Sequence, residues 1–368
     1  MNRAAEWAQA ERVLCVRLDS MGDVIMTGPA LRALKRTRPG RRLTLLTSPA
    51  GAMIAPYLPA VDDVIVYAAP WVRATAPNAS AAAERALIAR LRALGFDGAI
   101  VFTVYSQSAL PAAHLCYLAE IPRRLAYCRE NPYQLLTDWV PEPEPEQRLR
   151  HEVRRQLDLV ACLGAVPDDE RLRLQLPAAE RAAAQQRLAR LGIAPESRWV
   201  IVHPGASAPS RRYPGASFAA AARMLVEAHG CIVVFTGSAE ERALIEDIRR
   251  GMQAPSHSLA GELTLGELCG LIALAPLLIA NNTGPVHIAA AFGTPVVDLY
   301  ALTNPQHMPW EVENRVLYHN VPCKYCYKSV CPEGHNACLR RVPPAAVVDA
   351  ALELLALARP PAVARAGD

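Results

Sequence analysis

Apolar and polar positions follow two patterns that alternate along the chain. Short apolar runs rich in β-branched residues predict strands, and longer runs in which Ala, Leu and Arg recur at helical spacing predict amphipathic helices. The predicted strands are 12–18, 42–47, 63–68, 98–103, 199–205, 231–237, 276–282 and 295–301. The predicted helices include 27–37, 80–94, 148–163, 178–191, 215–229, 239–251, 264–274, 285–292 and 344–358. Strands that alternate with helices in this way favour an α/β fold with parallel sheets.

The elements fall into two series, which predicts two Rossmann-like units in tandem with a cleft between them. The segment 139–147, WVPEPEPEQ, is too rich in Pro to form the interior of a helix, and 166–177 resembles a linker into the second series. We therefore predict an N-terminal domain over 1–170, a second domain over 171–345, and a C-terminal helix and tail over 346–368. The last apolar helix either closes the second unit or crosses back to the first.

Composition and charge exclude several classes of protein. The 368 residues are 52% hydrophobic and 20% charged, so the chain can bury substantial cores. The 39 Lys and Arg against 35 Asp and Glu give a net charge of +4, which does not indicate nucleic-acid binding but is compatible with anionic substrates or an anionic membrane surface. The sequence lacks both an apolar run long enough to span a bilayer and a secretion signal, so we predict a cytoplasmic protein.

A strand-to-helix turn near the N-terminus carries the first candidate site. The sequence RLDSMGDVIMTGPALRALKR (17–36) places Gly22 in a predicted tight turn, with Asp19 and Asp23 in or beside it. Asp23 is the better candidate for a general base, because a carboxylate at such a turn is accessible yet held by backbone donors. The alternative is that Asp23 caps the helix, and the two roles are compatible.

A basic loop follows the first strand of the second series. Within HPGASAPSRRYPGASF (203–218), Arg211 and Arg212 lie at the expected carboxyl edge of the sheet. Two guanidinium groups suit a diphosphate, because each carries a permanent charge and can donate two hydrogen bonds to phosphoryl oxygens. The alternative is a solvated basic loop.

The next strand leads into an acidic helix start, FTGSAEERALIEDI (235–248). Glu240 and Glu241 complement the helix dipole, and one of them could instead accept hydrogen bonds from ribose or sugar hydroxyls.

A third turn of the second series, NNTGPVHIAAAFGTPVV (281–297), joins a buried strand to an apolar helix. Thr283 and Gly284 offer backbone N–H groups at the helix N-terminus, where Pro285 loses no hydrogen bond. His287, one turn into the helix, either faces the same site or packs in the core.

Four of the ten cysteines cluster near the C-terminus. The segment CKYCYKSVCPEGHNACL contains Cys323, Cys326, Cys331 and Cys338, with His335 among them. These residue types match the ligands of a structural zinc or iron site, although the spacing is not that of a common zinc finger. Redox or disulfide pairing and unliganded thiols are the alternatives. The other six cysteines are scattered and are expected to be ordinary buried thiols.

The order of these motifs resembles the heptosyltransferases of glycosyltransferase family nine. SMGDVIMTGPAL, HPGAS with RRYP, GSAEE and NNTGPVHIAAAFGTPVV occur in the family's order, and the resemblance covers about residues 12–355. It implies a GT-B fold in which the N-terminal domain binds the acceptor and the C-terminal domain binds the nucleotide sugar. The cysteine-rich segment is also similar to one found in some members.

The resemblance also implies a role for each motif residue. Asp23 matches the catalytic aspartate, and Arg211 matches a basic residue on the donor phosphates, with Arg212 following it. Glu241 matches an acidic residue that binds the ribose of the donor. The residues that match the donor-binding segment are Asn282, Thr283, Gly284 and His287. The family commonly has Asp where this chain has Asn282, which keeps the size of the side chain but loses its charge.

The implied activity is an inverting transfer of heptose or a related sugar from ADP-heptose to a lipopolysaccharide core or other glycan acceptor, with no metal required. A nucleotide-sugar epimerase and a non-catalytic metal-binding interaction protein are the alternatives. A dehydrogenase is not favoured, because no Gly-x-Gly-x-x-Gly follows the first strand. The basic run 31–42 either meets an anionic glycolipid at the inner face of the membrane or forms a solvated helix face.

Overall fold

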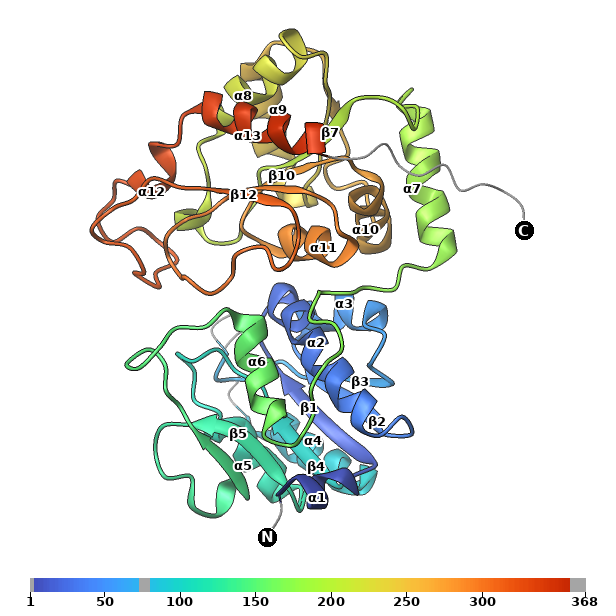
Figure 1. Cartoon of the computed structure of the whole chain (residues 1–368), viewed down its shortest axis with the longest axis vertical. Coiled ribbons are helices and arrows are strands. Elements are labelled where there is room, and N and C mark those ends of the chain that lie inside the picture. The colour runs from blue at the N-terminus through green and yellow to red at the C-terminus, as the bar shows by residue number, and fades with distance from the viewer. Residues whose placement is uncertain (1–2, 73–79, 358–368) are drawn as a thin grey trace. The chain divides into compact units, whose positions relative to one another are not determined.

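The computed structural model describes residues 3–72 and 80–357 and contains two compact units, Met1–Gln175 and Leu176–Asp368 (Figure 1). Each unit is built on one six-stranded sheet in which every strand pair is parallel. The prediction of two Rossmann-like α/β units is therefore confirmed. Among the described residues, no helix is both long and apolar enough to cross a membrane.

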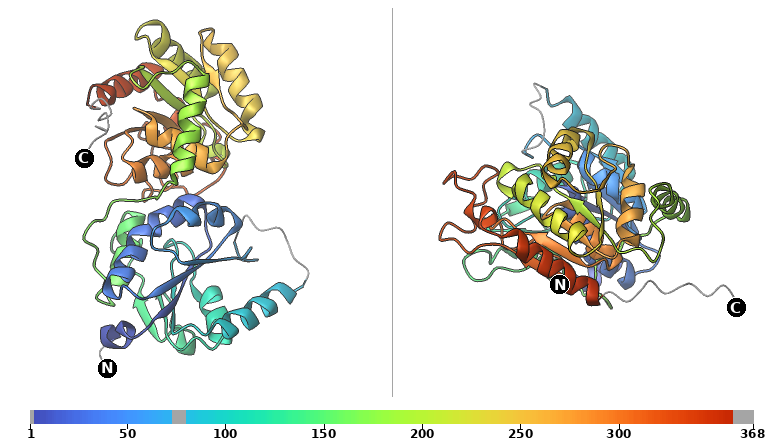
Figure 2. Two further views of the ribbon diagram at one scale, coloured as in Figure 1. Left: turned by 90° about the vertical axis from the view of Figure 1, so that its right-hand side faces the viewer. Right: turned by 90° about the horizontal axis from the view of Figure 1, so that it is seen from above.

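The N-terminal unit has helices on both faces of its sheet. Its strands are β1 (Arg12–Arg17), β2 (Arg42–Thr47), β3 (Asp63–Val66), β4 (Gly98–Val101), β5 (Arg124–Cys128) and β6 (Asp138–Pro141). Its helices are α1 (Arg3–Ala8), α2 (Met21–Thr37), α3 (Pro49–Ile54), α4 (Ala82–Leu94), α5 (Leu110–Leu118) and α6 (Glu152–Ala161). Helices α2, α3 and α6 cover one face, and α4 and α5 cover the other (Figure 2).

The C-terminal unit repeats this plan. Its strands are β7 (Trp199–His203), β8 (Ile232–Phe235), β9 (His257–Ser258), β10 (Leu278–Asn281), β11 (Val296–Leu299) and β12 (Asn314–Leu317). Its helices are α7 (Ala178–Arg190), α8 (Gly215–Glu227), α9 (Arg242–Met252), α10 (Leu265–Leu274), α11 (Gly284–Phe292), α12 (Ala337–Arg340) and α13 (Pro344–Leu357). Helices α8, α9 and α13 pack on one face of the sheet, and α7, α10 and α11 lie on the other side.

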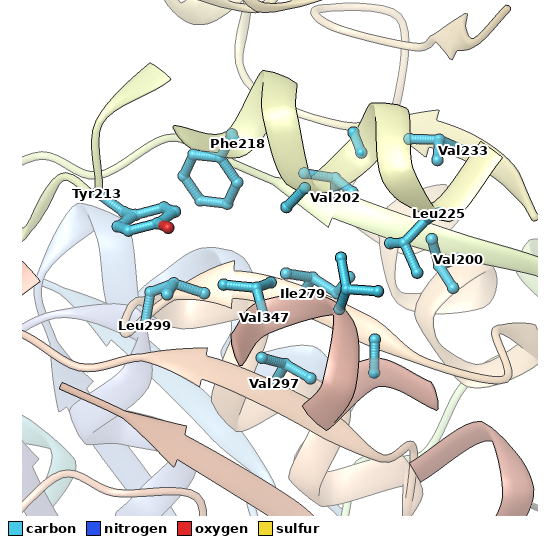
Figure 3. Packing of buried hydrophobic residues seen from close by; sticks show 14 of the residues in the cluster. Val200, Val202, Tyr213, Phe218, Leu225, Val233, Ile279, Val297, Leu299 and Val347 are labelled. Atoms are coloured by element: carbon cyan, nitrogen blue, oxygen red, sulfur yellow. The ribbon is translucent and has the colours of Figure 1, made fainter. Parts of the chain in front are cut away.

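Alternate residues of the central strands form the core beneath α8 and α13. Figure 3 shows Val202, Ile279 and Leu299 from three neighbouring strands in one cluster with Phe218 and Val347 from the two helices. Because successive side chains of a strand point to opposite faces, the residues between these positions point to the other face of the sheet. Helix α13 belongs to this core, so the last apolar helix closes the second unit.

The structure differs from the predicted elements in several ways, and helices α1, α3, α5 and α12 were not among those predicted. Helix α2 begins at Met21, six residues before the predicted start, because a capped first turn precedes its apolar stripe. Strands β5, β6, β9 and β12 were not predicted. Strand β12 has the partly polar sequence NRVL and β9 has only two residues, so neither carries a strong strand signal.

Candidate functional site

Both sheets have the strand order that creates a topological switch point. The order is β3-β2-β1-β4-β5-β6 in the first unit and β12-β11-β10-β7-β8-β9 in the second. Chain connections therefore leave in opposite directions from β1 and β4, and from β7 and β10. Ligands of open α/β sheets bind outside the carboxyl ends of the strands at such points. The four predicted site motifs follow β1, β7, β8 and β10.

The first turn of α2 holds Asp23 just beyond β1. Ser20 is the N-cap residue, and both its backbone N and its Oγ donate to Asp23 Oδ2, at 3.0 and 2.6 Å. Asp23 is thus the third residue of a capping arrangement and not the cap itself. The turn does not depend on Gly22, which lies inside the helix. Asp23 therefore takes part in capping the helix, and the Ser20 hydrogen bonds hold its carboxylate in place.

A fully buried arginine organises the carboxylates around Asp23. Arg17, the last residue of β1, forms ion pairs with Asp23 Oδ1 at 3.2 Å and with Asp19 Oδ2 at 2.8 Å, and donates to Glu152 Oε1 at 2.7 Å. Burial raises the pKa of Asp19 to about 6, against the lowering effect of Arg17, while nearby Asp23 raises it further. Arg17 and Glu152 were not predicted from the sequence as site residues. A charged residue at the end of an apolar strand was the available signal for Arg17.

The basic loop after β7 separates its two arginines. Ser210 N donates to Ser329 O at 3.0 Å, and Ser210 Oγ donates to Lys328 O at 2.8 Å, which anchors the loop beside Arg211. Arg211 lines a pocket described below. Arg212 is exposed and donates from Nε to the carbonyl oxygen of Ala206 at 2.7 Å. The two guanidinium groups are therefore not brought together on one pocket.

Glu241 lies over the ends of β7 and β8. Its Oε2 accepts from Ser238 N at 2.9 Å and is 4.0 Å from His203 Nε2. A Cβ atom added to Gly205 would meet Glu241 Oε1 at 1.9 Å, so this glycine makes room for the carboxylate. Burial lowers the pKa of His203, against the effect of Glu241. Glu240 is exposed, so Glu241 is the residue of the pair placed at the sheet edge.

The two asparagines after β10 have different roles. Asn281 is fully buried, accepts from Tyr213 N at 2.9 Å and donates to Pro204 O at 2.7 Å, so it ties the loop after β7 to β10. Asn282 donates from Nδ2 to Asp298 Oδ2 at 2.9 Å and to His307 O at 2.8 Å. No role was predicted from the sequence for Asn281 or Asp298.

Helix α11 begins directly after these asparagines. Thr283 is its N-cap residue and donates from Oγ1 to Asn281 O at 3.2 Å, and Gly284 is the first helical residue. Both are partly exposed, so the helix N-terminus is accessible. His287 is buried, with 4% of its surface exposed, which agrees with the alternative of a packed histidine. A role for His287 in binding stays a prediction.

A small pocket joins two of these motifs. Its walls include Arg211, Asn282, Tyr300, Thr303, Asn304 and His307. It lies at the carboxyl ends of β10 and β11 and collects a cationic side chain, an amide and hydroxyl groups. Such a lining suits a polar anionic ligand.

The cysteine-rich segment packs behind this pocket. Tyr325 N donates to Leu302 O, and Tyr327 N donates to Thr303 O at 2.9 Å. Cys323 Sγ lies 3.9 Å from His335 Nε2. Burial raises the pKa of Cys338, and the nearby thiols of Cys331 and Cys323 add to the shift.

The four thiols are free and partly exposed. Over residues 3–72 and 80–357, no three His, Cys, Asp or Glu side chains are arranged to hold a metal ion. The residue types fit zinc or iron, but their arrangement in this structure does not form a metal site. The metal site stays a prediction.

The basic run 31–42 is paired within its own unit. Lys35 Nζ donates to both carboxylate oxygens of Asp62, Arg36 pairs with Asp168 at 2.8 Å, and Arg42 pairs with Asp63 at 2.8 Å. The remaining cations, Arg32, Arg38 and Arg41, donate to backbone carbonyls of the unit. These contacts favour the alternative of an ordinary charged helix face over a membrane-binding patch.

Comparisons with known proteins agree with the family that the sequence resembles. The model of glycosyltransferase family 9 (heptosyltransferase) matches residues 84–337, which is more than half of the chain. The chain is 30% identical over 159 residues to a lipooligosaccharide heptosyltransferase 2 of Campylobacter jejuni. That match covers 42% of the chain and 50% of the relative, so it spans about half the length of this curated protein.

Two solved structures share the fold over nearly the whole chain. A family 9 glycosyltransferase of Veillonella parvula has a TM-score of 0.77 at 22% identity, covering 94% of this chain and 97% of the other. The Escherichia coli ADP-heptose lipopolysaccharide heptosyltransferase II has a TM-score of 0.72 at 23% identity, covering 94% and 99%. The predicted fold class is thereby confirmed.

Proposed function

Because the chain belongs to glycosyltransferase family 9 (heptosyltransferase), we propose that it transfers heptose or a related sugar from ADP-heptose to a lipopolysaccharide core or other glycan acceptor, with inversion at the anomeric carbon. This donor and this acceptor class are those in the name of the E. coli enzyme that shares the fold. The proposal divides the work between the units, with the acceptor on the N-terminal unit and the donor on the C-terminal unit.

One observation supports the donor assignment most directly: Arg211 and Asn282 line the same pocket next to the N-terminus of α11. A diphosphate needs positive charge and hydrogen-bond donors. The Arg211 guanidinium supplies both, and the amides of Thr283 and Gly284 with the helix dipole supply more. Glu241, at the neighbouring strand end, accepts hydrogen bonds from the ribose hydroxyls of the donor in this proposal.

The proposed base is Asp23. It removes the proton from an acceptor hydroxyl while that oxygen attacks the anomeric carbon on the face opposite the nucleotide, so the configuration inverts in one displacement. The bond from the anomeric carbon to the diphosphate oxygen breaks, and the charge that gathers on the departing diphosphate is stabilised by Arg211 and the α11 N-terminus. The proposal requires no metal for this step.

Isothermal titration with ADP-heptose tests the donor site. We compare the wild-type protein with Arg211→Ala and with the matched control Arg212→Ala, because the neighbouring Arg212 points to Ala206 O and does not line the pocket. Losing hydrogen bonds to a charged ligand should weaken binding about tenfold or more in Arg211→Ala, and Arg212→Ala should stay within about twofold. Equal losses in both variants, or no binding by the wild type, would contradict the assignment.

Product analysis separates this function from the epimerase alternative. An epimerase consumes the nucleotide sugar alone, whereas a transferase needs an acceptor. We expect ADP-heptose to persist when incubated with the protein alone and to release ADP when a heptose-deficient lipopolysaccharide core is added. Conversion of the donor without acceptor would favour the epimerase.

For the cysteine-rich segment we propose a structural metal, zinc or iron, that takes no part in the transfer step. The ligand types of Cys323, Cys326, Cys331 and Cys338 support this, although their arrangement described above does not. Elemental analysis of protein purified without chelator should find about one equivalent, and Cys331→Ser should lower it. Protein that is active and free of zinc and iron would overturn the proposal.

A further inference from the structure

Asp298 is a buried carboxyl group in the middle of an apolar strand. Figure 3 shows its neighbours Val297 and Leu299 in the core beneath α8 and α13, so Asp298 points to the opposite face of β11. It is fully buried, and burial raises its pKa to about 8 against the lowering effect of its hydrogen bond from Asn282. An isolated carboxyl group in such a place is costly, and among the described residues its hydrogen-bond partner is Asn282 alone.

Asn282 and Asp298 meet because of the strand register. Ala280 pairs with Asp298 across β10 and β11, and Asn282 lies two residues beyond Ala280 on the same face. The amide of Asn282 then donates one hydrogen to Asp298 Oδ2 at 2.9 Å and the other to His307 O at 2.8 Å. Both amide hydrogens are therefore used.

This pairing fixes the orientation of the Asn282 amide. A carboxamide can turn over and exchange its oxygen and nitrogen, but here two acceptors hold the nitrogen side. With the nitrogen held by two acceptors, Oδ1 is the amide atom left for a ligand at the pocket that Asn282 lines. Asn282 thus presents an uncharged hydrogen-bond acceptor to whatever occupies the pocket.

An acceptor oxygen fits a hydroxyl group and not a phosphate, which has only acceptors of its own at neutral pH. The order of the strands indicates which hydroxyl group of the donor the Asn282 oxygen contacts. Glu241 follows β8, Arg211 follows β7, Asn282 follows β10, and these strands are successive neighbours, with β11 next. With the ribose at Glu241 and the diphosphate near Arg211, the transferred sugar lies at the β10–β11 end.

We propose that Asp298 is a positioning residue that holds Asn282 Oδ1 toward a hydroxyl of the transferred sugar, and so determines how the pocket recognises the sugar part of the donor. This inference rests on the proposed function. It also gives a physical reason for Asn where the family commonly has Asp. A carboxylate at 282 would lie against the carbonyl of His307 with no hydrogen to donate, and it would face a second carboxylate wherever Asp298 is ionised.

Titration with two probes, ADP and ADP-heptose, isolates the sugar contact. The variants are Asp298→Ala, which removes the acceptor that orients Asn282, and Asp298→Asn, whose amide oxygen can still accept from Asn282. A third is Asn282→Asp, and a fourth combines it with Asp298→Asn. Thermal unfolding of each variant accompanies the titration, because Asp298 is buried.

We expect Asp298→Ala to weaken ADP-heptose binding about tenfold and to change ADP binding less than about twofold. Asp298→Asn should restore ADP-heptose binding to near the wild-type value. At a pH above 8, where Asp298 is ionised, Asn282→Asp should weaken it, and adding Asp298→Asn should recover most of that loss, because the new amide can donate to the carboxylate.

Three outcomes would overturn the positioning role. The first is an equal loss of ADP and ADP-heptose binding in Asp298→Ala, which would indicate a general structural effect. The second is unchanged binding of both probes in a folded Asp298→Ala variant. The third is an Asp298→Asn variant that binds ADP-heptose as weakly as Asp298→Ala. Failure of the wild type to bind either probe would be different, since it would overturn the proposed donor site and this inference with it.

Discussion

The guanidinium of Arg17 lies 3.2 Å from Asp23 Oδ1, at the point where β1 ends and α2 begins. Arg17 is fully buried, whereas the Asp23 side chain keeps 11% of its surface exposed. The Arg17 guanidinium and the two Ser20 donors thus fix the Asp23 carboxylate, and part of its side chain remains exposed. Such a carboxylate is well ordered, which the proposed base requires.

Replacing Asp23 with Asn should abolish most of the transfer activity without unfolding the protein. The amide oxygen can still accept from Ser20, but it cannot take a proton from the acceptor. We expect kcat to fall about 10²- to 10⁴-fold. Affinity for ADP-heptose should be unchanged, because the donor residues of the proposal belong to the other unit. Steady-state kinetics measures kcat, and titration measures the affinity for ADP-heptose. A near-normal kcat would rule out Asp23 as the base.

Arg17→Met should destabilise the N-terminal unit. The change leaves the carboxylates of Asp19, Asp23 and Glu152 without their shared cation, in a site where Glu152 is fully buried. Removing one partner of buried ion pairs costs on the order of 3–5 kcal/mol. Urea unfolding measures the loss, with Arg12→Met at the exposed start of the same strand as control, expected within about 0.5 kcal/mol of wild type. Equal stability of both variants would contradict this account.

Gly205→Ala should weaken donor binding through Glu241. The new Cβ would lie 1.9 Å from the present position of Glu241 Oε1, so the carboxylate must move. We expect ADP affinity to fall about as much as in Glu241→Ala, and the double variant to be no weaker than either single one. Gly251→Ala is the control, because its Cβ would make an ordinary contact at 3.6 Å. Additive losses would show that Gly205 acts independently of Glu241.

Asp298 should make stability depend on pH. Its folded pKa is raised by burial from 3.8 to about 8, so the folded state keeps a proton that the unfolded state loses above about pH 4. This contribution to stability is present at low pH and is lost as pH rises toward 8, by up to about 1.4 kcal/mol per pH unit for one proton. Asp298→Asn lacks this titration, so its advantage over wild type should grow from pH 4 to pH 8. A difference that is flat with pH would refute the raised pKa.

The pattern of apolar residues predicted the central strands to within a few residues. β2 was predicted with the observed bounds, and β7 with two extra residues at its end. The early start of α2 was missed because Ser20, Gly22 and Asp23 interrupt the apolar stripe, although Ser20 followed three residues later by Asp23 is a capping pattern that could have revealed it. The edge strand β12 forms because β11 offers it backbone partners, which local sequence does not reveal.

The sequence by itself determined the class of fold, the order of the motifs and the candidates Asp23, Arg211, Glu241 and Asn282. The fold class and the first three candidates depend on local periodicity, turn chemistry and side-chain type, which are properties of neighbouring residues in the chain, whereas Asn282 followed from the resemblance to the family. Tertiary structure decided which candidates meet. Arg17 reaches Glu152 across 135 positions, Asn282 meets Asp298 through the register of β10 and β11, and Arg212 points away from the pocket that Arg211 lines. Such pairings follow from the packing and register of strands far apart in sequence, so no local pattern contains them.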